Sequence, residues 1–141
     1  MIQSTSMRTS GKELGFYVTY NHPTWSLESY PDYSRYEGMD AMEMVNYGCL
    51  TEGYDDDDGR VYDDLLNQGK RIYTIATDDN HNEKDDDGPY LDSFGGYIML
   101  GSEKLEYEPV TKALVEGKSE LYFCGNLPQI FLLLITIRFC R

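Results

Sequence analysis

Short apolar runs alternate with helical patterns along this chain. Four β-prone runs predict strands over residues 16–20, 41–45, 72–76 and 94–100. The run at 16–20 has no polar alternation, which is typical of a strand buried on both faces in a parallel sheet. The first three runs each give way to polar residues. We therefore predict an α/β fold in which parallel strands are joined by short crossover helices.

The clearest helical pattern lies between the second and third runs. In residues 61–68, one face carries the apolar residues Val61, Tyr62, Leu65 and Leu66. Aspartates at 55–58 precede this segment and basic residues follow it, so both ends complement the helix dipole. The helix completes a β-α-β unit, which predicts a right-handed parallel crossover.

Weaker helical signals occupy other parts of the chain. A second helix is predicted to open at Glu108-Pro109 and to be closed by Gly117 and Lys118. Residues 10–13 fit either a helix start or the last turn of a helix that began earlier. Residues 25–36 contain Pro31 and predict only short helical turns.

Composition and charge limit the classes of partner. The 141 residues, 40% of them hydrophobic, predict a single folded domain over 1–141. Twelve basic residues against 25 acidic ones give a net charge of -13, which repels nucleic acid and anionic membranes. The acidic runs at 55–58 and 85–87 do not match the EF-hand pattern, so we interpret them as solvated segments. Neither nucleic acid nor a membrane is expected as a partner.

The cysteines and the two ends of the chain indicate the cellular compartment. Cys49, Cys124 and Cys140 form no C-x-x-C pair, and an odd number of cysteines gives no disulfide framework. The start of the chain lacks the pattern of a secretory signal. The apolar stretch at 130–137 is shorter than the roughly 20 residues of a membrane-spanning helix. We expect a cytoplasmic protein.

The candidate site lies where the apolar runs end. Asp79 and His81 follow the run at 72–76, and His22 follows the run at 16–20. Loops after parallel strands converge on one edge of the sheet, and carboxylate and imidazole groups are ligands for divalent cations. The alternative is that each histidine is a structural residue of a turn. Pro23 predicts an extended backbone at His22.

Two features near the candidate site are not interpreted as metal ligands. Glu43 lies inside the second strand, so we expect it to make a structural hydrogen bond or ion pair and not to bind a metal. Residues 82–92 form a polar segment that either lies over the site or is a plain linker.

Two short blocks in this sequence carry a resemblance to a known family. Asn21-His22-Pro23 and Asp79-Asn80-His81 resemble the later metal-ligand blocks of the PHP (polymerase and histidinol phosphatase) family. Similarity to bacterial members extends over roughly residues 11–117. The resemblance implies a distorted β/α barrel, and it implies hydrolysis of a small phosphoester substrate by a metal-activated hydroxide.

The resemblance also implies site residues. His22, Asp79 and His81 would be metal ligands for zinc, manganese or iron, and Asp79 would also act as a catalytic residue that handles a proton. No substrate-binding residue is implied.

The chain departs from the family at both ends. The family's opening H-x-H block is absent, and residues 118–141 form a divergent apolar tail. These departures predict the carboxyl-terminal half of a PHP-like barrel, from a truncated or frame-altered gene, with exposed apolar surface that favours self-association. The alternative to the phosphoesterase is a non-catalytic remnant that binds metal at most weakly.

Overall fold

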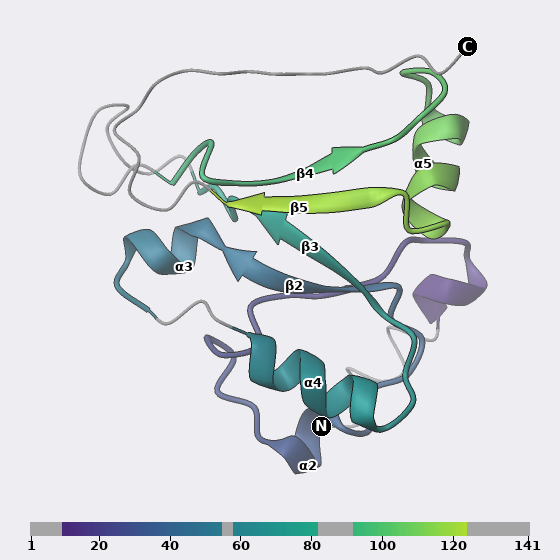
Figure 1. Ribbon diagram of the computed structural model, residues 1–141. Helices are drawn as coiled ribbons and strands as arrows, with labels where there is room; N and C mark the ends of the chain where they lie inside the picture. Colours follow the sequence, from purple (N-terminus) through teal and green to yellow (C-terminus); the bar gives the residue numbers. More distant parts are fainter. Residues whose placement is uncertain (1–9, 55–57, 82–91, 124–141) are drawn as a thin grey trace.

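The computed structural model describes residues 10–54, 58–81 and 92–123 (Figure 1). No helix within these ranges has the length and apolar character needed to cross a membrane. The elements in chain order are β1 (Thr19–Tyr20), α2 (Tyr30–Tyr33), β2 (Ala41–Asn46), α3 (Tyr47–Thr51), α4 (Gly59–Asn67), β3 (Tyr73–Thr77), β4 (Gly96–Leu100), α5 (Tyr107–Val115) and β5 (Ser119–Phe123).

The first three strands form a parallel sheet in the order β1-β2-β3. The predicted parallel β-α-β unit is therefore confirmed for β2, α4 and β3, and α4 lies below β2 in Figure 1. All three strands point the same way, so their carboxyl ends share one edge of the sheet. We call this the carboxyl edge. The described strands show a mixed α/β fold, and a partial PHP-like barrel stays a prediction.

The last two strands depart from the predicted parallel pattern. β5 pairs antiparallel with β4, with Gly96 opposite Phe123 and Leu100 opposite Ser119. The predicted divergent tail at 118–141 therefore begins with a paired strand, because the backbone groups of β5 find partners on β4. Residues 124–141, which hold the rest of the predicted tail, lie outside the described residues.

The first strand is shorter than predicted. β1 has only two residues, and Phe16 is 64% exposed, so the expected strand with two buried faces is wrong at its start. The Asp40 carboxylate explains the difference, because it accepts the Val18 N–H at 2.8 Å and replaces a strand partner there. Residues 10–13 are helical, and the chain turns at Gly15 with a φ of +81°.

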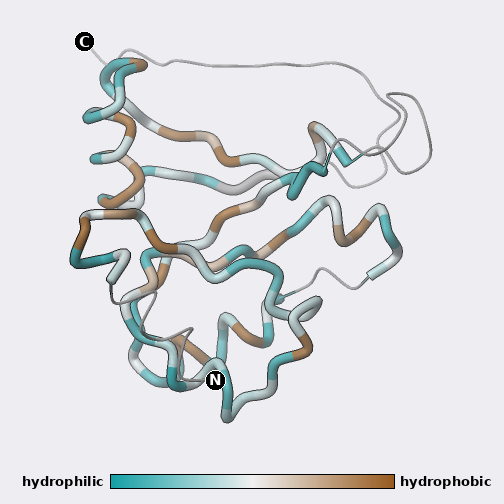
Figure 2. Tube along the Cα trace, turned by 180° about the vertical axis from the view of Figure 1, so that it is seen from behind, coloured by the Kyte–Doolittle hydropathy of each residue, from teal (hydrophilic) through white to brown (hydrophobic). Residues whose placement is uncertain are grey.

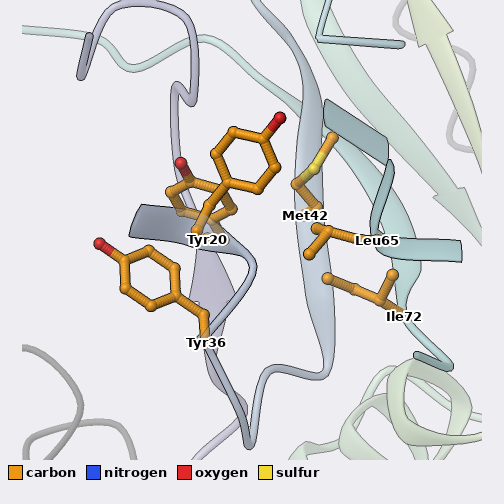
Figure 3. Close-up of a cluster of buried hydrophobic side chains, with 6 residues drawn as sticks. Tyr20, Tyr36, Met42, Leu65 and Ile72 are labelled. Carbon is orange, nitrogen blue, oxygen red and sulfur yellow. The ribbon is translucent and has the colours of Figure 1, made fainter. Parts of the chain in front are cut away.

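A core of tyrosine and aliphatic side chains packs between the sheet and α4. Figure 3 shows Met42, Leu65 and Ile72 on one side of this cluster and the rings of Tyr20 and Tyr36 on the other. Met42 and Leu65 are fully buried, and each such side chain stabilises the fold by about 1.5–3 kcal/mol. Figure 2 shows hydrophobic residues along the strands and hydrophilic residues in many connections. On the predicted apolar face of α4, Leu65 is fully buried, whereas Leu66 is 43% exposed.

The core tyrosines keep their hydroxyl groups paired with carboxylates. The Tyr20 hydroxyl donates to Glu28 at 2.6 Å, and burial together with this hydrogen bond raises the pKa of Tyr20 far above its ordinary value. The Tyr33 hydroxyl donates to Asp64 at 2.6 Å, and burial followed by this bond raises the pKa of Tyr33 to about 12. Buried polar groups are thus satisfied in this core.

Candidate functional site

Polar groups at the ends of all three parallel strands meet at the carboxyl edge. His22 follows β1, Asn46 is the last residue of β2, and Asp79 follows β3. Tyr20 lies opposite Met42, and Asn46 lies opposite Thr77 after a shift of the β2–β3 register between Glu43 and Val45. The predicted convergence of the three strand ends is therefore observed.

Glu43 lies at the centre of this edge and is only 1% exposed. One carboxylate oxygen, Oε2, accepts the His22 backbone N–H at 2.6 Å and the Asn46 side-chain amide at 3.0 Å. The other oxygen accepts the Thr77 hydroxyl. The predicted structural hydrogen bond of Glu43 is confirmed, and it joins the ends of all three strands.

Asn46 connects Glu43 with Asp79. Its Nδ2 donates to Glu43 Oε2 and to Asp79 Oδ2, both at 3.0 Å. Its Oδ1 accepts the Cys49 N–H at 2.8 Å, which makes Asn46 the N-cap of α3. Neither this helix nor the contact with Asp79 was predicted. The signal was an asparagine, a favoured cap residue, directly before Tyr47.

Asp79 and His81 lie close together at the site. Asp79 Oδ1 lies 3.6 Å from His81 Nε2, with the side chains 35% and 65% exposed. Asp79 has a φ of +47°, a left-handed conformation that is uncommon for residues other than glycine. The His81 backbone N–H donates to the Asp92 carboxylate at 2.9 Å. The structure therefore brings two of the three predicted ligands together.

His22 takes a different place. Its Nδ1 lies 3.2 Å from the Ser26 hydroxyl, and its ring packs edge-on against Trp25 with centroids 5.0 Å apart. The predicted extended backbone is wrong, since φ is +33°. The hydrogen bond from the His22 N–H to Glu43 explains the conformation, because it fixes the backbone before Pro23. This environment is that of a turn histidine.

The three predicted ligands do not form a metal centre as placed. Within residues 10–54, 58–81 and 92–123, no group of three or more His, Cys, Asp or Glu side chains is arranged to hold a metal ion. Structural zinc sites use four protein ligands and catalytic zinc sites three. Of the three predicted ligands, Asp79 and His81 lie close together.

The segment after β3 is bound to the start of β4. The Asp78 carboxylate accepts the backbone N–H groups of Phe94, Gly95 and Gly96 at 2.7 to 2.9 Å. The Asp78 carbonyl oxygen accepts the Gly48 N–H at 2.8 Å. These bonds attach Asp78, the residue directly before Asp79, to the start of β4 and to α3. The predicted cover at 82–92 lies outside the described residues, except for Asp92.

The electrostatic environment of the edge is negative. Burial raises the pKa of the Cys49 thiol to about 11, and the carboxylates of Asp79 and Glu43 add to this rise. A thiolate at Cys49 is therefore disfavoured beside these carboxylates. The same environment favours a cation.

A separate cavity of about 450 Å³ lies at the opposite, amino-terminal edge of the sheet, with Glu37 and Lys70 in its lining. The Lys70 ammonium donates to Glu37 at 2.6 Å and to the Tyr36 carbonyl at 2.8 Å. Its charge is thus already neutralised within the fold. This cavity contains none of the predicted site residues.

In comparisons with protein-family models, curated proteins and solved structures, nothing matches this chain. The PHP resemblance therefore stays a prediction that rests on the short blocks around His22 and Asp79.

Proposed function

We propose that this protein is a PHP-like α/β module whose carboxyl edge binds a divalent cation weakly through Asp79 and His81, without hydrolysing phosphoesters on its own. The observation that carries the proposal is the 3.6 Å approach of Asp79 Oδ1 to His81 Nε2 in a negative environment. A carboxylate oxygen and an imidazole nitrogen suit zinc, manganese and iron. Two protein ligands supply fewer bonds than a zinc site normally has, so the affinity is low.

Calorimetric titration of the chain with Mn²⁺ and Zn²⁺ tests this proposal. We expect one weak site, lost in both Asp79→Asn and His81→Ala. Asp63→Asn is the matched control, because it makes the same change at an exposed position on α4. Binding that survives both site substitutions would disprove the proposal.

The second candidate is a PHP-type phosphoesterase that uses His22, Asp79 and His81 as metal ligands. It is favoured by one observation, that His22 and Asp79 follow strands of the same parallel sheet and are linked through Glu43 and Asn46. In this reading the substrate is a small phosphoester and Asp79 handles a proton. Further metal ligands would come from outside the described residues.

His22→Ala separates the two candidates. The ring of His22 contacts Ser26 and Trp25, so the weak two-ligand site predicts cation affinity within about twofold of the wild type. The phosphoesterase predicts a loss of cation binding together with a loss of p-nitrophenyl phosphate hydrolysis in added Mn²⁺. Hydrolysis that depends on His22 and Asp79 would establish the enzyme.

A further inference from the structure

We infer that Asn46 is a positioning residue that orients the Asp79 carboxylate toward the cation, an inference that rests on the proposed cation site. Asn46 is 1% exposed, and each polar atom of its side chain has a partner. Its oxygen faces a backbone N–H, which only donates. Its nitrogen faces two carboxylates, which accept. This set of partners fixes the amide orientation.

The contact with Asn46 gives the two oxygens of Asp79 different roles. Oδ2 accepts from Asn46 at 3.0 Å, while Oδ1 lies on the side of His81 at 3.6 Å. Only Oδ1 then faces the proposed cation together with the imidazole. Hydrogen bonds to a ligating carboxylate set its orientation, and their loss typically weakens metal affinity by about 10–100-fold.

Asn46 can fix Asp79 because it is itself held from two directions. The N-cap bond to Cys49 attaches it to α3, and Glu43 attaches it to the centre of the sheet. Asp79 follows the neighbouring strand, β3, and has an uncommon backbone conformation. The side chain of Asn46, held by β2 and α3, therefore fixes the orientation of the Asp79 carboxylate.

Asn46→Ser provides the test, because serine caps a helix but is too short to reach Asp79. Its control is Asn67→Ser, the same change at an exposed position at the end of α4. We expect Asn46→Ser to weaken Mn²⁺ binding by about tenfold or more. Asn67→Ser keeps the wild-type affinity. Urea unfolding and circular dichroism of each variant separate a change in affinity from a change in folding.

A second measurement requires neither the cation nor a substitution at Asn46. The two side-chain amide protons of Asn46 give separate NMR signals, and in Asp79→Ala one of them loses its carboxylate acceptor. We expect that signal to shift while the proton facing Glu43 keeps its position.

The outcomes separate the two proposals. Wild-type Mn²⁺ affinity in Asn46→Ser, or unchanged amide signals in Asp79→Ala, overturns the positioning role of Asn46 even where the cation site stands. A wild-type chain that binds no Mn²⁺ overturns the proposed function, and with it the cation-directing role of Asn46. The amide signals then decide whether Asn46 still orients Asp79 within the fold.

Discussion

Replacing Glu43 tests how much of the fold depends on the carboxyl edge. The Glu43 carboxylate accepts from three donors on three parts of the chain, His22, Asn46 and Thr77, and the residue is 1% exposed. Leucine has a similar size and no acceptor. A buried donor left without a partner costs about 1–3 kcal/mol. The buried Asn46 amide bears this cost for the hydrogen that loses Glu43, and the partly buried His22 and Thr77 groups each bear less. We therefore expect Glu43→Leu to lower the free energy of unfolding by about 2–5 kcal/mol.

Glu43→Gln separates the hydrogen bonds from the charge. Glutamine keeps one oxygen that can accept from His22 and Asn46, and the Thr77 hydroxyl can accept from the new amide. We expect a loss of only about 1 kcal/mol. Urea unfolding followed by far-ultraviolet circular dichroism measures both variants, with the exposed Glu13→Leu as control. A Glu43→Leu variant no less stable than Glu43→Gln would refute the reasoning.

Two further predictions concern the surroundings of this edge. Gly96→Ala places a methyl group 2.1 Å from the Thr77 carbonyl oxygen, whereas at Gly101 the nearest atom is 3.6 Å away. We expect thermal unfolding to show a loss of about 1–3 kcal/mol for Gly96→Ala and almost none for Gly101→Ala; equal losses would contradict this packing. Cys49 has a pKa raised from its ordinary 9 to about 11, so the folded state retains the proton and stability falls as the pH rises from 9 through 11. In a Cys124→Ser, Cys140→Ser background, Cys49→Ala should flatten that decline, and iodoacetamide at pH 8 should label the folded protein much more slowly than the unfolded one.

The elements predicted best were those with strong local signals. β2, α4 and β3 form a continuous unit in which apolar runs, helix periodicity and charged helix ends agree, and each was predicted to within two residues at either end. α3 was missed because Asn46 was interpreted only as the polar end of a strand. It is also the cap of the next helix. β5 was not predicted, because its antiparallel partner β4 is distant in the sequence and a local sequence pattern does not reveal such a pairing.

The candidate site was predicted in part. The order of the strands brought their polar ends to one edge, as the sequence pattern indicated, and Glu43 had its expected structural role. The orientation of each side chain could not be predicted, because it depends on tertiary partners. Glu43 holds the backbone of His22, Asn46 holds Asp79, and Asp92 holds the backbone at His81.

The packing of Trp25 against His22 has an experimental consequence. Trp25 is the single tryptophan in the sequence, it is 49% exposed, and its ring centroid lies 5.0 Å from that of the imidazole. Indole emission depends on the groups that surround the ring. The unlabelled protein therefore contains its own fluorophore beside the turn that follows β1, and a rearrangement of that turn becomes observable as a change in emission without any attached dye.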